Sequence, residues 1–277
     1  MQSKERIIAG KTMRLETGRI ARQSNGSVLV TYGETTVLAA VNASKEPRED
    51  LDFFPLQVEY REKHYAGGKI PGGFFKREAR PGEHEVLTSR VTDRPIRPLF
   101  PKGFKNETQV MITVLQSDGE NNPDVLAGVG ASAALMASTI PWNGPIASVR
   151  VGRVGGAYVV NPTRTELEDS DMEMVVSGNS ETIVMVEGEA DCISETEILD
   201  ALKQAHTVIK EIIELQNELV STLDVVKDEV VIPEPDEDLV STIDEKIGSQ
   251  IDDIIKIVDK HERSTAKDSM VNAIIEL

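Results

Sequence analysis

One short stretch combines aromatic and cationic side chains in a pattern that could bind a polyanion. Two adjacent phenylalanines follow a Gly-Gly pair, and basic residues follow the phenylalanines at short spacing. The residues concerned are Phe74, Phe75, Lys76, Arg77, Arg80, Arg90, Arg94 and Arg97. Cationic groups hold the phosphates of single-stranded RNA while its bases stack on aromatic faces, with about 1–3 kcal/mol per stacked base. Because two phenylalanines in a glycine turn are hard to bury together, the stretch predicts contact with a single-stranded nucleic acid.

The charge distribution favours a partner for this stretch and also offers a simpler explanation. The chain has a formal net charge of -17, yet residues 60–105 hold eleven Lys or Arg against five Asp or Glu. Residues 165–277 hold eight against thirty. A local reversal of sign often marks a binding surface. The alternative is that the arginines pair with nearby carboxylates, and for Arg90, Arg94 and Arg97 both interpretations stay open.

Carboxylates form a weaker candidate site. Glu168, Asp169, Asp171 and Glu173 cluster where a strand is expected to begin. Alternation places Asp171 and Glu173 on one face, which is an arrangement that suits a divalent cation. Composition alone favours a solvated acidic turn, so Glu173 is only a weak candidate metal ligand. The sequence has no glycine-rich nucleotide-binding motif, no Cys/His metal spacing and no nucleophile elbow.

Hydrophobic patterns predict the elements that must position these residues. Valine-rich and alternating stretches indicate strands, and apolar residues at a spacing near 3.6 indicate helices. The expected elements are strands within 12–60, a loop at 64–73, a helix at 82–94, a strand at 106–117, a small-residue helix at 124–139, a second β-rich block, and a long amphipathic helix at 194–223. This order of strands, helices, strands and a helix indicates an α+β fold.

The last part of the sequence predicts a linker and a helical segment. Residues 227–238 contain two prolines among acidic residues, which is typical of a linker. Residues 239–277 place isoleucines on one helical stripe. The pattern continues to Leu277 without a capping residue. We therefore expect the sequence to be a portion of a longer protein.

Composition excludes several classes of protein. A hydrophobic fraction of 39% argues against global disorder. The first residues lack the apolar core of a signal peptide, and no apolar run reaches the roughly 18 residues that a membrane span needs. The single cysteine, Cys192, cannot form an intramolecular disulfide, and we expect it to be buried or half-buried. The sequence predicts a cytoplasmic protein without a membrane partner.

Two long stretches resemble the first core domain of the polynucleotide phosphorylase family. They read GGFFKREARPGEHEVLTSRVTDRPIRPLFPKGF and ENNPDVLAGVGASAALMASTIPWNGPI, and the resemblance covers nearly the whole chain. It implies a ribonuclease-PH-like fold in two subdomains, 1–145 and 146–226. The linker 227–238 and the beginning of an all-helical domain at 239–277 would follow.

The resemblance also implies activity and partners for the parent protein. Members of this family are homotrimeric rings that degrade RNA from its 3′ end, using phosphate to release nucleoside diphosphates, with assistance from Mg²⁺. Phe74, Phe75, Lys76 and Arg77 fall on the family's loop that grips RNA. Single-stranded RNA, further copies of the chain and proteins of RNA-degradation complexes are the expected partners.

The sequence departs from the family's catalytic pattern. Where the active core has a serine run that binds phosphate, this chain has Asn122-Pro123-Asp124. Where the family has two aspartates and a lysine, the matching positions are Leu167, Glu173 and Val175. We therefore expect no catalytic residue and no bound Mg²⁺ or phosphate in this chain. The alternatives are a stand-alone module for RNA binding or assembly, and an independently active ribonuclease-PH-like phosphorolytic enzyme.

Overall fold

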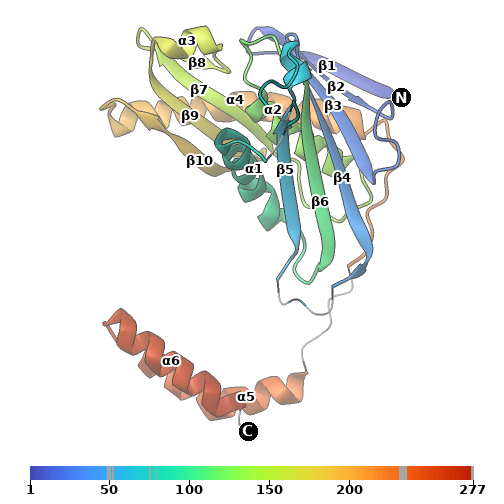
Figure 1. The fold of residues 1–277 in the computed structure, drawn as a ribbon. Helices are drawn as coiled ribbons and strands as arrows, with labels where there is room; N and C mark the ends of the chain where they lie inside the picture. Colours follow the sequence, from blue (N-terminus) through green and yellow to red (C-terminus); the bar gives the residue numbers. More distant parts are fainter. Residues whose placement is uncertain (49–50, 52, 75, 79, 231–235, 276–277) are drawn as a thin grey trace. The chain divides into compact units, whose positions relative to one another are not determined.

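The computed structural model describes residues 1–48, 51, 53–74, 76–78, 80–230 and 236–275 (Figure 1). The chain divides into two units, Met1–Val230 and Val231–Leu277. The first unit contains two β-sheets and their helices, and the second contains two helices. The predicted α+β fold, with mixed sheets packed against helices and a helical stretch after them, is confirmed.

The larger sheet has six strands in the order β1-β2-β3-β4-β6-β5. The strands are β1 (Gln2–Ile8), β2 (Lys11–Thr17), β3 (Gly26–Tyr32), β4 (Thr35–Pro47), β5 (Leu56–Glu62) and β6 (Asn106–Gln116). All neighbours are antiparallel except β5 and β6, which are parallel because helix α1 (Glu83–Ile96) crosses between them. The parallel pair gives the sheet two distinct ends. The segment after β5 lies at the upper end in Figure 1, and the segments before β5 and β6 lie at the lower end.

The smaller sheet is antiparallel, in the order β10-β9-β7-β8. Its elements are β7 (Ala147–Val154), β8 (Ala157–Val160), the short helix α3 (Arg164–Glu168), β9 (Ser170–Gly178) and β10 (Ile183–Ala190). The long helix α4 (Glu195–Val220) packs against β7, β8 and β9. The predicted subdomains 1–145 and 146–226 would each contain one of the two sheets, and that division stays a prediction.

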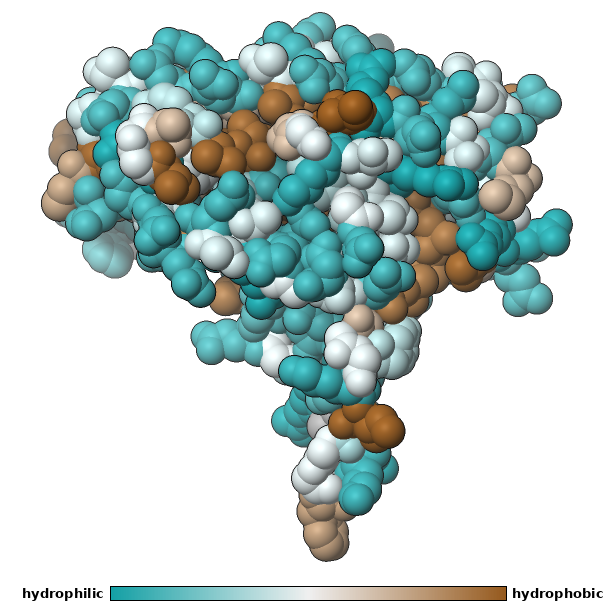
Figure 2. Space-filling model, turned by 90° about the horizontal axis from the view of Figure 1, so that it is seen from above, coloured by the Kyte–Doolittle hydropathy of each residue, from teal (hydrophilic) through white to brown (hydrophobic). Residues whose placement is uncertain are grey.

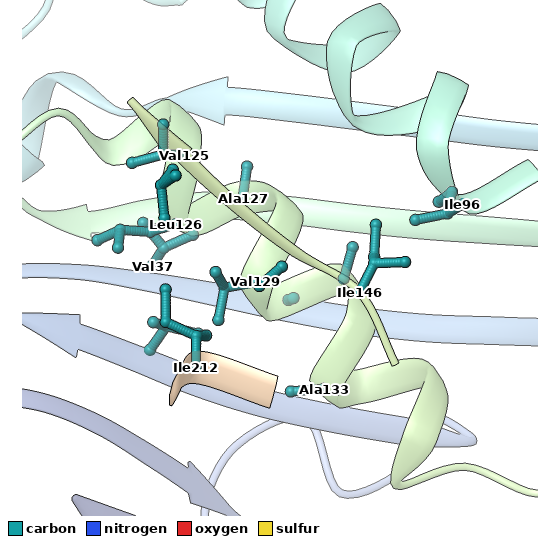
Figure 3. Close-up of a cluster of buried hydrophobic side chains, with 14 of the residues drawn as sticks. Val37, Ile96, Val125, Leu126, Ala127, Val129, Ala133, Ile146 and Ile212 are labelled. Atoms are coloured by element: carbon teal, nitrogen blue, oxygen red, sulfur yellow. The ribbon is translucent and has the colours of Figure 1, made fainter. Parts of the chain in front are cut away.

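Helix α2 (Pro123–Met136) lies in the core between the two sheets (Figure 3). Its side chains Val125, Leu126 and Val129 meet residues from β4, the start of β7 and α4. Small residues let the helix approach its neighbours closely. A Cβ atom at Gly128 would lie 2.4 Å from Ser148 Oγ, and one at Gly130 would lie 3.1 Å from Ala39 Cβ. The small-residue pattern therefore serves close packing of this helix.

The predicted linker begins as an anchored segment. Lys227 Nζ donates hydrogen bonds to the carbonyl oxygens of Leu135 and Ser138, at 2.7 and 2.8 Å. The backbone N–H of Asp228 donates to the carbonyl of Thr139 at 2.8 Å. These contacts attach the segment to carbonyl groups at and just after the C-terminal end of α2.

The second unit consists of α5 (Glu237–Ile254) and α6 (Lys260–Ile275), which contact each other. Neither helix has a buried residue. Among the described residues, no helix combines the length and apolar composition that crossing a membrane requires. The expectation for Cys192 is wrong, because its residue is exposed, just after β10.

Candidate functional site

The aromatic and basic stretch forms a loop between β5 and α1. After β5 the chain makes a short 3₁₀ helix, His64–Gly67, and Gly68 then adopts the left-handed conformation with φ 67°. Phe74 is 93% exposed, and Lys76, Arg77 and Arg80 are also exposed. Phe75 lies outside the described residues. We call residues 69–82 the grip loop.

Glu78 ties the grip loop to the end of β5. Its carboxylate accepts hydrogen bonds from Lys63 Nζ at 2.6 Å and from the backbone N–H of His64 at 2.8 Å. The His64 ring lies 3.3 Å away through Nδ1. The hydrogen bond from Lys63, followed by the one from the His64 backbone, lowers the pKa of Glu78 to about 2. The carboxylate is therefore ionised at neutral pH, and it holds the base of the loop by charge-assisted bonds.

The other end of the grip loop is fixed at the first turn of α1. Glu85 accepts hydrogen bonds from the N–H of Gly82 at 2.6 Å and from the N–H of Glu62 at 2.9 Å. A carboxylate here also interacts favourably with the positive end of the helix dipole. Together, Glu78 and Glu85 connect the C-terminal half of the loop to β5 and the residues just after it.

A polar cavity of about 500 Å³ lies at the base of the grip loop. It is lined by Arg61, Glu62, Lys63, His64, Glu78, Arg80, Gly82 and Glu85. Beside it, Tyr60 Oη donates to Glu62 at 2.8 Å, and His84 Nε2 lies 3.3 Å from the same carboxylate. Hydrogen bonding with Glu62 raises the pKa of His84. The cationic and anionic groups at the base are thus largely engaged with one another.

The remaining predicted arginines lie away from the loop. Arg90 is exposed on α1. Arg94 forms an ion pair with Glu187 of β10. Arg97 pairs with Asp93 at 2.9 Å and donates to the carbonyl oxygens of Phe54 and Leu56 at 3.2 and 3.1 Å. The structure therefore brings Lys76, Arg77 and Arg80 together but places Arg97 at the opposite end of β5. Whether these arginines contact RNA stays a prediction.

Two of the three positions expected to match the family's catalytic residues, Glu173 and Val175, line a second cavity of about 490 Å³. Asp124 comes from the first turn of α2, Arg150 from β7, and Glu173 and Val175 from β9. Helix α1 covers this cavity with residues that include His84 and Thr88. Leu167 lies elsewhere, on α3.

Arg150 dominates the charge of this second cavity. Its guanidinium pairs with both Asp124 and Glu173, and its side chain is only 11% exposed. Its Nε is buried without a hydrogen-bond partner in the described part of the chain. A divalent cation needs oxygen ligands that a neighbouring cation does not already neutralise. The residues present therefore do not fit Mg²⁺. Within the described ranges, no three His, Cys, Asp or Glu side chains could hold a metal ion.

Arg150 was not among the residues predicted from the sequence. The available signal was a charged residue between the valines of the stretch SVRV, since a charge on a buried face of a strand needs a partner. Its two partners come from α2 and β9, which are far apart in the chain. Only the fold shows that they meet.

Comparison with known proteins gives consistent matches along the chain. Domain 1 of the 3′ exoribonuclease family matches residues 9–141, and domain 2 matches residues 144–208. The polyribonucleotide nucleotidyltransferase of Thermomicrobium roseum is 49% identical over 268 residues, which are 97% of this chain and 34% of that protein. The same enzyme from Gemmatimonas aurantiaca is 52% identical over 262 residues, 95% of this chain and 36% of that protein. The enzyme from Thermus thermophilus is 48% identical over 264 residues, which are 95% of this chain and 37% of that protein.

The chain spans little more than a third of the length of these curated relatives. The two domain matches lie in the unit Met1–Val230 and leave the two helices of the second unit outside them. The resemblance stated from the motifs is confirmed. The chain belongs to the 3′ exoribonuclease family, and its two ribonuclease PH domains correspond to the N-terminal portion of polyribonucleotide nucleotidyltransferase.

Proposed function

We propose that this chain grips single-stranded RNA and contributes to ring assembly in a polynucleotide phosphorylase, while the chemistry takes place elsewhere in the parent protein. The parent activity would be phosphate-dependent 3′-to-5′ degradation of RNA with release of nucleoside diphosphates. The observation that carries the RNA-binding part is the grip loop. It presents an exposed aromatic side chain beside three cationic ones.

The loop has the chemistry that binds RNA without reading its sequence. Phe74 supplies a face on which a base stacks, and Lys76, Arg77 and Arg80 supply charge for phosphates. The hydrogen bonds of Glu78 and Glu85 hold the C-terminal half of the loop before RNA binds. Less conformational entropy is then lost on binding.

Arg150 supports the proposal that this half is catalytically silent. A magnesium-assisted displacement needs free carboxylates and a cradle for phosphate. Here the Arg150 guanidinium pairs with Asp124 and Glu173, two of the four carboxylates that line the cavity, and Arg94 pairs with a third, Glu187. Asn122-Pro123-Asp124 stand where the family has its serine run. We therefore assign Mg²⁺ and phosphate to the parent enzyme and to none of the residues of this chain. Assembly into a homotrimer is the remaining part of the proposal, and the mass of the chain in solution tests it.

Substitution of the loop tests the RNA grip. We expect Phe74→Ala with Phe75→Ala to weaken binding of a single-stranded oligonucleotide about tenfold or more, because stacking is lost. We expect Lys76→Glu with Arg77→Glu to weaken binding and to reduce its salt dependence, by a slope of about 0.7 per lost phosphate contact. Fluorescence anisotropy across a salt series measures both effects. As a matched control, Lys203→Glu changes an exposed cation on α4 and should bind normally. Unchanged affinity of both loop variants at low salt would remove the proposal.

A further inference from the structure

A second group of aromatic and cationic residues lies at the other end of β5 from the grip loop. Phe53 and Phe54 immediately precede β5, and the connection before β6 brings further rings and lysines to the same place. Together they form a cavity of about 230 Å³ lined by Phe53, Phe54, Arg97, Phe100, Pro101, Lys102, Gly103, Phe104 and Lys105. This end of the sheet is the lower one in Figure 1. We call this set the aromatic cavity.

The floor of the aromatic cavity is built from packed rings. The Phe54 ring centroid lies 4.6 Å from that of Phe100 and 5.6 Å from that of Phe104. The rings of Phe100 and Phe104 are parallel within 9°, with centroids 5.9 Å apart, and each residue is only 8% exposed. Trp142 supports Phe100 from behind, at 6.4 Å. The floor is therefore formed before any ligand binds.

Arg97 is part of this floor. Its bonds to Asp93 and to the carbonyl oxygens of Phe54 and Leu56 fix the guanidinium, whose carbon lies 6.0 Å from the centre of the Phe54 ring. A guanidinium at this distance from the ring centre makes a favourable cation–π interaction with Phe54. Phe53 differs from the other rings, because it is 64% exposed. It offers a flat apolar face at the rim of a rigid base.

The charge of the cavity selects an anionic partner. The described lining contains Arg97, Lys102 and Lys105 and no carboxylate, in a chain whose net charge is -17. An acidic peptide would pair with the lysines, but its carboxylates would not stack on the exposed Phe53 ring. Single-stranded RNA satisfies both, since its phosphates pair with lysine and its bases stack on phenylalanine.

We propose that the aromatic cavity is a second contact for single-stranded RNA, with a base on Phe53 and phosphates on Lys102 and Lys105. This inference rests on the RNA-binding function proposed above and adds the place of a second contact on the same strand of RNA. The seven residues of β5 separate the two contacts by about 20 Å, at roughly 3.3 Å per residue. An oligonucleotide of moderate length reaches from one to the other along the sheet edge.

The test uses a fluorescent oligo(A) of about twelve nucleotides and the whole chain. Phe53→Ala should weaken binding about tenfold, the contribution of one stacked base. Phe53→Tyr should retain binding because it keeps the ring, whereas Phe53→Leu should lose as much as the alanine variant. Lys102→Glu with Lys105→Glu should weaken binding and reduce the salt slope. Lys203→Glu on α4 is the charge control.

Photocrosslinking locates the contact independently of affinity. RNA that carries 5-iodouridine should crosslink to the peptide containing Phe53, and Lys102→Glu with Lys105→Glu should reduce the yield. The proposal is overturned if the Phe53 and lysine variants bind as the unmodified chain does while the Lys76→Glu, Arg77→Glu variant is weakened. Equal affinity of the leucine and tyrosine variants would also overturn it, since apolar packing alone would then account for Phe53.

The same set of variants separates this inference from the proposed function. If the grip-loop variants bind normally and the aromatic-cavity variants do not, the loop assignment is wrong and the cavity assignment stands. If the unmodified chain binds no RNA, both are wrong. If an acidic peptide binds at Lys102 and Lys105 and RNA does not, the cavity is a protein-docking site and the inference fails.

Discussion

Arg150 shows how one residue can change the chemistry of a cavity. It comes from the middle of β7 and pairs with two of the four carboxylates that line the site, Asp124 and Glu173. Removing one partner of a largely buried ion pair is costly, because the remaining charges keep their desolvation penalty. At the scale of the residue, the proposal that this half is catalytically silent depends on this guanidinium.

Substitution of Arg150 tests this view through stability. We expect Arg150→Met to lower the free energy of unfolding by about 3 kcal/mol, since Asp124 and Glu173 lose their cation. Urea unfolding measures the change. Lys203→Met is the control, because Lys203 is 76% exposed and its pair with Asp200 contributes little. An Arg150 variant as stable as the control variant would show that the ion pairs do not hold this site together.

Glu78 is the second residue whose role can be isolated. Replacing it by alanine removes the acceptor for Lys63 and for the His64 N–H. We expect faster hydrogen exchange at the His64 amide and weaker RNA binding, because the base of the grip loop is released. Glu83→Ala, an exposed carboxylate on the first turn of α1, controls for the change of net charge. An unchanged rate of hydrogen exchange at the His64 amide would show that Glu78 does not hold this backbone N–H.

Helix α2 packs closely between the two sheets because it has glycine where a larger side chain would clash. Glycine inside a helix usually costs about 1 kcal/mol relative to alanine. At Gly128 we expect alanine, rather than glycine, to be the destabilising residue. Its Cβ atom would lie 2.4 Å from Ser148 Oγ and 3.0 Å from Ser148 Cβ. The hydroxyl is itself buried and bonded to Ser177 Oγ at 2.8 Å, so it cannot rotate away freely.

Gly128→Ala should therefore destabilise the protein by about 1 kcal/mol or more, since overpacking outweighs the gain in helix propensity. Thermal or urea unfolding measures the change. In a Ser148→Ala background the additional loss should shrink, because the nearest atom is gone. A stabilised Gly128→Ala variant would contradict the close packing of α2 on β7.

The segment after α4 contributes a pH-dependent contact to the end of α2. Burial lowers the pKa of Lys227 from 10.5 to about 8, although the nearby Asp228 opposes the shift. The folded state therefore binds this proton less tightly than the unfolded chain does. It follows that the contribution of Lys227 to stability rises as the pH increases from about 8 towards 10.5.

Lys227→Met gives the corresponding prediction. The variant loses two hydrogen bonds to the carbonyl oxygens of Leu135 and Ser138, and we expect a loss of about 1–2 kcal/mol. The difference in stability between the unmodified chain and the variant should grow between pH 8 and pH 10.5. A difference that is constant over this range would show that Lys227 titrates normally.

Sequence patterns predicted most elements but not how their charges are arranged. The long helix α4 and the valine-rich strands follow from periodicity, which local physics dictates. Strand β1 was missed because QSKERII is largely polar and is an edge strand. Arg97 was grouped with the grip loop because it follows closely in sequence. Helix α1 returns the chain to the opposite end of β5. The local sequence pattern predicts the helix but not the direction in which it runs relative to β5.

At the scale of the whole molecule, the surface restricts where RNA can bind. Figure 2 shows a largely hydrophilic face on which hydrophobic residues gather in separate patches. Because the net charge is -17, we expect most of the surface to repel a polyanion, and we expect the Lys and Arg residues within 60–105 to provide the attraction for RNA. Binding should therefore weaken steeply with added salt. The same acidic surface limits non-specific contacts elsewhere.

The most direct test incubates the purified chain with end-labelled poly(A), phosphate and Mg²⁺ and follows the RNA on native and denaturing gels. The account predicts that the RNA migrates as a complex on the native gel, that its length is unchanged on the denaturing gel, and that no nucleoside diphosphate appears. Release of nucleoside diphosphates, or RNA that never enters a complex, would contradict the claim that this chain holds RNA without cleaving it.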